Sequence, residues 1–543
     1  MEPRSIEGQF VDVIEGKVYP ARVSFADGRV LAVERLDRAP EHHILPGFVE
    51  AHIHIESSQL CPSRFAEAVV PHGTTSVIND PHEISNVLGM TGVRYMLDDA
   101  NGVPLRTYFT APSCVPSTKH DTSGAVFGKE EIDLLLRMKE FVALGEVMDF
   151  PAVLRDDNGI KGKIKVAREY WKPVDGHCPG LIGNDLVKYI NAGISSDHES
   201  LTADEAEEKF HLGMWIMVQE GSANRNLGAL LPFAKANECF LVSDDLQATD
   251  LMSGHLDLLL RKAVALGMDP IHAIRAVTAW PSWHYFLPGG SLAKGKVADI
   301  VIVDDLKNFN VQEVYIAGDL VAKGGKALFT PRPVHLGDRM AAQHRMADEF
   351  TLPHAGPNAK VRVIRVVPNH INSKAEVADL EVKDGVVQSD LAKDVITIAV
   401  VNRYHQAPVA LGFVSGFNVK RGAVASTVAH DSHNIIAIGP DPECLAQAVN
   451  KVTEQGGGYY VTDKDRHESL VLDVAGLMST APCHAVAEDE ARVFEMLARM
   501  GCELSAPMMT LSFQSLLVVP ELKLCDKGLF DTKRQEFVPV VIA

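Results

Sequence analysis

The chain has 543 residues and a formal net charge of −19, from 52 basic and 71 acidic side chains. This acidic balance disfavours nonspecific binding to nucleic acid or to an anionic membrane surface, and the length favours two or three domains. The eight cysteines form no C-x-x-C pair, the N-terminus has no apolar signal segment, and no apolar run approaches about 18 residues. We therefore expect a cytoplasmic protein without a membrane span.

Short strands are predicted at the start of the chain and again past its middle. Residues 8–45 contain several apolar runs, and the Asp27-Gly28 pair between two of them is typical of a β-hairpin. A similar pattern returns in ADIVIVDDL (298–306) and EVYIAGDLVAK (313–323). We predict one small β-domain, residues 1–46 plus 287–330, assembled from both ends of an inserted region.

The inserted region repeats one unit. Eight apolar, β-rich runs between residues 44 and 245 end in polar or Gly-rich residues, and amphipathic stretches such as KEEIDLLLRMKEFVAL separate them. Eight strands alternating with helices predict an α/β fold, a (β/α)8 TIM-like barrel over residues 47–286. Active sites of such barrels form where the strands end, which is where the polar residues fall.

A different pattern follows the Pro-bearing junction Thr330-Pro331-Arg332-Pro333. Residues 340–543 contain the apolar runs VRVIRVVP, DVITIAVVN and NIIAIG and the helical stretch AEDEARVFEMLARMG. They predict a separate C-terminal domain of the α/β or α+β class.

Histidine and carboxylate residues recur at the ends of the predicted barrel strands. Alternate side chains of a strand share a face, so ionisable groups on the first strand would face the barrel interior, where a metal would offset the cost of burying them. Four histidines and two carboxylates suit two divalent ions if one carboxylate bridges, and an aspartate can move the proton of the attacking water. The candidates are His52, His54, Glu146, His177, His198 and Asp244, with Glu56 on the same face as the first pair.

These residues stand in motifs that resemble the amidohydrolase superfamily and, within it, adenine deaminases of the bacterial type. The resemblance runs over nearly the whole chain. It includes LPGFVEAHIHIESS, VPHGTTSVINDPHEISNVLG, LGEVMDFP, DGHCPGL, SSDHES, KGKVADIVIVDDL and, near the C-terminus, RGAVASTVAHDSHNIIAIG and PELKLCDKGLFD. Position by position, it implies that the six candidates are metal ligands and that Glu146 bridges.

The resemblance implies a metal-dependent hydrolase that converts adenine and water to hypoxanthine and ammonia in purine salvage or catabolism. A hydroxide bridging two Mn(II) or Fe(II) ions would attack the ring, and Asp244 would carry its proton to the leaving amine. Zn(II) also fits such ligands. Glu56 would protonate the ring, or would only fix a neighbouring histidine. By analogy with the superfamily we expect a homo-oligomer, a dimer or a tetramer.

Two other functions stay open at this point. The chain could be an amidohydrolase for another aminated heterocycle or a cyclic amide, or a non-catalytic barrel that serves as a scaffold. Glu220 and Ser222 are predicted substrate contacts, with a tight turn as the alternative. His430 and His433, in AHDSHN, predict a secondary site that binds a metal or reaches over the barrel mouth, with a polar turn as the alternative. Gln219 stands where the family implies an arginine.

Overall fold

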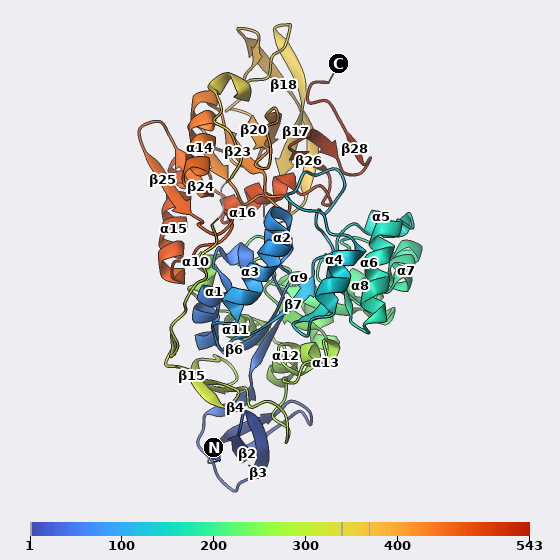
Figure 1. Cartoon of the computed structure of the whole chain (residues 1–543), viewed down its shortest axis with the longest axis vertical. Helices are drawn as coiled ribbons and strands as arrows, with labels where there is room; N and C mark the ends of the chain where they lie inside the picture. The colour runs from blue at the N-terminus through green and yellow to red at the C-terminus, as the bar shows by residue number, and fades with distance from the viewer. Residues whose placement is uncertain (1–2, 338–339, 369, 543) are drawn as a thin grey trace.

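A computed structural model of the chain describes residues 3–337, 340–368 and 370–542. Figure 1 shows three parts along the long axis: a small sheet near the N-terminus, a barrel with its helices in the middle, and a large sheet at the end that holds the C-terminus. The barrel therefore lies between the two sheet regions.

Eight short parallel strands form the barrel wall. Strands such as β5 and β6 are buried along their whole length, as expected when helices cover one face and side chains fill the other. Ladders join the first five strands and the last three, and a parallel bridge between Ile53 and Asp244 joins the two ends of the wall. The predicted barrel class is confirmed. The strands are β5 (Phe48–Ile53), β6 (Thr74–Asn79), β7 (Arg106–Ala111), β8 (Phe141–Val147), β9 (Val174–Gly176), β10 (Ser196–Asp197), β11 (Trp215–Gln219) and β12 (Phe240–Val242).

Helices follow the strands, and some of them begin at polar caps. The side chain of Asp157 accepts hydrogen bonds from the first backbone N–H groups of α6, and Thr202 does the same for α8. The helices of this region are η1 (Ile55–Ser58), α1 (Pro62–Val69), η2 (Val70–His72), α2 (His82–Leu88), α3 (Met90–Ala100), α4 (Lys129–Leu136), α5 (Phe150–Leu154), α6 (Asn158–Glu169), α7 (Gly183–Ala192), α8 (Ala203–His211), α9 (Leu227–Ala236), α10 (Ala248–Leu251), α11 (Leu256–Ala265), α12 (Pro270–Ala276) and α13 (Ala279–His284).

The small sheet combines strands from before and after the barrel. Its order is β16-β15-β14-β13-β4-β1-β2-β3, and β4 pairs with β13 on one side and with β1 on the other. Asp27 and Gly28 have φ of 49° and 75° and form the turn between β2 and β3, as the hairpin motif predicts. The strands are β1 (Arg4–Asp12), β2 (Lys17–Ala26), β3 (Arg29–Arg35), β4 (His43–Pro46), β13 (Ile300–Val303), β14 (Val311–Ile316), β15 (Asp319–Lys323) and β16 (Lys326–Ala327).

The C-terminal part is built on a nine-stranded mixed sheet in the order β19-β18-β17-β21-β20-β23-β22-β24-β25. Apolar residues of α14 and of strands such as β22 and β23 share one core cluster, so this helix covers one face of the sheet. Its elements are η3 (Ala347–Phe350), β17 (Asn358–Val366), β18 (Ser373–Lys383), β19 (Val386–Val387), β20 (Ile396–Val401), β21 (Ala410–Ser415), β22 (Ala423–Ser426), β23 (Ile435–Gly439), α14 (Pro442–Glu454), β24 (Gly458–Thr462), β25 (His467–Val471), α15 (Cys483–Arg499), α16 (Pro507–Ser512), η4 (Phe513–Ser515), β26 (Leu522–Cys525), β27 (Gly528–Asp531) and β28 (Glu536–Phe537).

Among the described residues, no helix combines the length and the apolar character that crossing a membrane requires.

Candidate active site

The first barrel strand and the residue after it bring His52 and His54 into the interior, where their side chains are 2% and 4% exposed. Nδ1 of His54 lies 3.0 Å from the carbonyl oxygen of Asp80 and donates its hydrogen there. This contact fixes the tautomer in which Nε2 carries the free lone pair. His54 can therefore bind a cation through Nε2.

Glu146, at the end of β8, stands between the first-strand histidines and those of the fifth and sixth strands. Its Oε1 lies 3.2 Å from Nε2 of His54. Its Oε2 lies 2.9 Å from Nδ1 of His177 and 3.2 Å from Nε2 of His198. Because its two oxygens face different imidazole groups, this carboxylate can bridge two ions.

Asp244 follows the last strand, β12, in a left-handed conformation with φ of 56°. A non-glycine residue adopts this conformation at a cost that is often found at functional sites. The backbone N–H of Asp244 donates to the carbonyl of His52, and its Oδ1 lies 3.4 Å from Nε2 of His52 and 3.3 Å from Nε2 of His54. The loop thus holds one carboxylate oxygen against both first-strand histidines.

The chemistry of these six buried residues fits divalent cations. Ligand atoms of His52, His54 and Asp244 lie within 4.8 Å of one another, as do those of His52, Glu146 and His198. Burial alone lowers the pKa of His54, but its hydrogen bonds to Asp244 and Glu146 outweigh burial and raise that pKa well above the usual value. The site therefore favours positive charge, and buried Nε2 of His52 has no hydrogen-bond partner within the described part of the chain. A metal would supply that charge and accept these nitrogen and oxygen ligands.

Glu199 and His82 also face this cluster, beside the six candidates. Glu199 lines the cavity, and burial raises its pKa to about 7. His82 also lines the cavity, with Nδ1 3.7 Å from Glu146 and Nε2 3.6 Å from Asp431. Strand alternation would turn Glu199 away from His198, but β10 ends at Asp197 and the chain then turns. In the sequence, the position of Glu199 directly after the predicted ligand His198 was the feature that could have identified it as a site residue.

The C-terminal part of the chain supplies one wall of the cavity. The ring of His430 stacks on Phe513, with centroids 4.7 Å apart and planes 19° apart. Nε2 of His430 lies 3.2 Å from a carboxylate oxygen of Glu83. The wall therefore combines apolar and ionisable groups, from residues Ile371, His430, Asp431, Phe513 and Leu516.

The other predicted residues lie outside the cavity lining. His433 is fully buried, and its Nδ1 accepts from the backbone N–H of Ala429. Glu56 is buried beside Glu83, and its Oε1 accepts weakly from a backbone N–H at 3.4 Å.

Glu220 and Ser222 are likewise engaged elsewhere. Glu220 pairs with Lys262, and the hydroxyl of Ser222 donates to Asp250. The amide side chain of Gln219, the residue that departs from the family pattern, donates to the carboxylate of Glu199 at 2.8 Å. The structure does not bring Glu220 or Ser222 to the candidate ligands.

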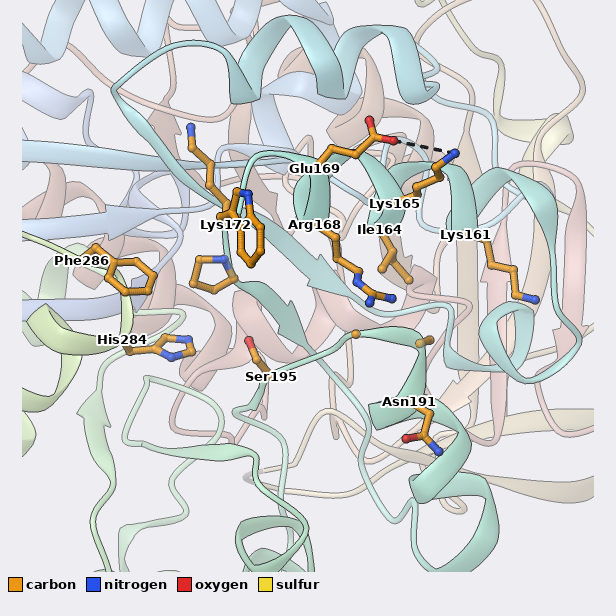
Figure 2. A pocket seen from close by; sticks show the side chains of 14 residues that line it. Lys161, Ile164, Lys165, Arg168, Glu169, Lys172, Asn191, Ser195, His284 and Phe286 are labelled. Atoms are coloured by element: carbon orange, nitrogen blue, oxygen red, sulfur yellow. Dashed lines mark ion pairs between the residues drawn. The ribbon is translucent and has the colours of Figure 1, made fainter.

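A larger hollow of about 850 Å³ lies between α6 and the segments that precede β9 and β10, at the opposite strand ends from the ligands (Figure 2). The three lysines of its lining already have partners. Lys161 pairs with Asp156, Lys165 pairs with Glu169, and the ammonium of Lys172 donates to backbone carbonyl groups. Size alone therefore does not locate the chemistry, since the cavity beside the six candidates measures only about 30 Å³.

Two family models match the chain. The model described as the amidohydrolase family matches residues 43–321, which span the barrel strands and part of the small sheet. The model described as the adenine deaminase C-terminal domain matches residues 370–536. The two matches together cover both walls of the cavity.

Similar curated proteins extend over the full length. A protein named adenine deaminase from Methanothermobacter thermautotrophicus is 47% identical over 98% of both chains. Proteins of the same name from Methanosphaera stadtmanae and a Sulfurovum species are 44% and 42% identical, over at least 98% of each chain.

Proposed function

Because the chain belongs to the adenine deaminase family, and through its barrel to the amidohydrolases, we propose that it hydrolyses adenine to hypoxanthine and ammonia in purine salvage or catabolism. The full-length similarity to adenine deaminases carries this proposal. A barrel alone would not, because one barrel fold supports many unrelated reactions.

We propose two divalent ions per chain, Mn(II) or Fe(II). His52, His54 and Asp244 would hold one ion, His177 and His198 the other, and Glu146 would bridge them, as its split contacts support. When bound, such a pair of ions supplies a water that is nucleophilic near neutral pH. Nitrogen and oxygen ligands without thiolate suit Mn, Fe and Zn, so the identity of the metal needs measurement.

The chain's own groups then handle protons. Asp244 takes the proton from the attacking water and delivers it to the amino group on C6, which leaves as ammonia. A second acid must protonate a ring nitrogen. Burial raises the pKa of both Glu199 and Glu56, to about 7 and about 8. Glu199 lines the cavity and Glu56 lies outside the lining, so Glu199 is better placed for this step.

The C-terminal wall would bind the purine. Ile371, Phe513 and Leu516 offer apolar surface for a flat ring, and a stacked aromatic contact favours such a ligand. Asp431 and Glu199 offer carboxylates for hydrogen bonds to ring nitrogens or the amino group. Apolar faces with a few polar groups at the edges are typical of small-molecule sites.

The direct test is to prepare the protein with Mn(II) or Fe(II), count bound metal and measure ammonia release from adenine. We expect two ions per chain and stoichiometric hypoxanthine. If adenine were inert while another aminated heterocycle or a cyclic amide turned over, the substrate would be wrong and the site would stand. A fully metallated protein inert toward all of these compounds would favour the scaffold alternative.

We also propose a cytoplasmic homo-oligomer, a dimer or a tetramer. All eight cysteines are buried and free, which suits a reducing compartment. Light scattering of the purified protein measures its oligomeric state directly.

A further inference from the structure

A buried glutamate of the C-terminal part contacts two barrel loops at once. Glu490, on α15, is fully buried. Its Oε1 accepts hydrogen bonds from the side-chain amides of Gln59 and Gln247, both at 2.7 Å. Its Oε2 accepts from the backbone N–H of Thr249 at 3.2 Å and from the Thr249 hydroxyl at 2.8 Å. Four donors therefore converge on one carboxylate.

These donors belong to the loops that carry the candidate chemistry. Gln59 follows η1, five residues beyond His54. Gln247 and Thr249 come three and five residues after Asp244, at the start of α10. The helices α10 and α15 are far apart in the sequence, yet they lie side by side in Figure 1. Glu490 thus links the loop after the first strand to the loop after the eighth.

A buried carboxylate without a cation beside it is unfavourable, so its presence on α15 requires an explanation. Its hydrogen-bond partners among the described residues are all neutral, and burial raises its pKa to about 7. Burying an acid without a cation costs free energy, which the four hydrogen bonds offset in part. The carboxylate offers an acceptor to all four donors, whereas a glutamine would offer a single acceptor oxygen and an apolar residue none.

Further contacts hold the first loop to the C-terminal part at the same place. The side chain of Gln59 also donates to the hydroxyl of Tyr459 at 2.8 Å. The backbone N–H of Ser479 donates to the carbonyl of Gln59 at 2.7 Å, and that of Cys61 donates to the carbonyl of Ser479 at 3.1 Å. The two loops also touch directly, because the hydroxyl of Ser57 lies 2.5 Å from a carboxylate oxygen of Asp245. Glu490 adds an anchor on α15 that both loops share.

We propose that Glu490 is a positioning residue: it sets the distance between the loop carrying His54 and the loop carrying Asp244, and so lets the C-terminal part complete the barrel site. This inference rests on the proposed deaminase function. Reacting groups displaced by about 1 Å can cost on the order of 100-fold in rate, so a loosened link should act on turnover.

The test is Glu490→Gln in the full-length, metal-loaded protein. An amide presents one acceptor oxygen and an NH2 group, so two of the four donors lose their acceptor. We expect kcat for adenine to fall by about 10-fold or more, with two bound ions and KM within about twofold of wild type. Hydrogen exchange should quicken at residues 59–61 and 247–249. Glu488→Gln makes the same chemical change at an exposed position of α15 and should leave both measurements unchanged.

Wild-type kcat per metallated chain in Glu490→Gln, even with a lowered melting temperature, would reduce Glu490 to a structural tie and overturn the proposal. If this variant fails to fold, Thr249→Val removes a single hydroxyl donor, and the same reasoning applies with a smaller loss. Hydrogen exchange needs no substrate. A wild-type protein inert toward adenine would therefore refute the deaminase function, whereas unchanged exchange at both loops would refute the coupling.

Discussion

At the scale of single residues, Asp244 is the group whose two roles can be separated. Asparagine keeps an oxygen at the position that faces His52 and His54 but cannot accept the water's proton. We expect Asp244→Asn to lower kcat by about 10²–10⁴-fold while much of the bound metal remains. Metal analysis beside steady-state kinetics checks this, with Asp204→Asn on an exposed turn of α8 as the control. Near-wild-type turnover would remove Asp244 from the proton transfer.

The choice between two candidate acids is a second test at this scale. Glu199 lines the cavity, whereas Glu56 lies outside the lining beside Glu83. We expect Glu199→Gln to lower kcat by about 100-fold and Glu56→Gln to lower it much less. Both variants make the same change from carboxyl to amide, so each serves as the other's control. The opposite order of effects would return the acid role to Glu56.

The structure brings the predicted ligand candidates together but not the predicted substrate contacts, for a physical reason. Strand ends can be read from periodicity, so the sequence alone places His52, His54 and Glu146 at one barrel mouth. Loop conformation cannot be read in this way. Glu220 and Ser222 follow a strand yet bond to Lys262 and Asp250, while Glu199 turns inward because its strand ends early.

At the scale of secondary-structure elements, one ammonium ties the short strands β9 and β10 together. Lys209, on α8, donates to Asp197 at 2.9 Å and to the carbonyl of Cys178 at 2.8 Å. These two partners are the neighbours of His198 and His177. The position of two candidate ligands therefore depends on a buried ion pair.

Lys209→Met is expected to destabilise the protein strongly, by about 3–5 kcal/mol, because the buried carboxylate of Asp197 loses its cation. Thermal or denaturant unfolding, compared with Lys165→Met on α6, checks this. Lys165 is exposed and pairs with Glu169, so its loss should cost at most about 1 kcal/mol. Equal losses in the free energy of unfolding for the two variants would mean that the buried pair stabilises the fold no more than the exposed one.

Element prediction succeeded where the signal was local. The hairpin at Asp27-Gly28 and the alternation of eight strands with helices both follow from short-range pattern. The contacts of α15 with α10 and of His430 with Glu83 join residues more than two hundred positions apart, and no local periodicity encodes them. The sequence offered a reach of His430 over the barrel mouth only as one alternative, and the fold places His430 in the cavity wall.

At the scale of the whole molecule, the two sheet regions differ in their relation to the site. The small sheet lies at one end of the long axis, whereas the C-terminal sheet region lies at the end toward which the ligand-bearing strands point (Figure 1). The catalytic cavity is therefore made by two distant parts of the chain, and its integrity depends on their association.

A buried lysine gives that association a dependence on pH. Lys523, on β26, is fully buried and donates to the carbonyls of Ile371 and Phe513, two residues of the cavity wall. Burial lowers its pKa to about 7, whereas an unfolded chain keeps the usual value near 10.5. Between these two values the unfolded state binds a proton that the folded state does not, so this group adds stability as pH rises.

We therefore expect the wild type to gain stability over Lys523→Met by up to ~1.4 kcal/mol per pH unit above pH 7, with a constant difference at lower pH. Denaturant unfolding of both proteins at pH 6, 7.5 and 9 measures that difference. Lys533→Met removes an exposed lysine that pairs with Glu521, and its stability difference should not change above pH 7. Parallel pH profiles for wild type and Lys523→Met would show that the buried amine keeps its proton, and that hydrogen bonds to the two wall carbonyls outweigh the cost of burying its charge.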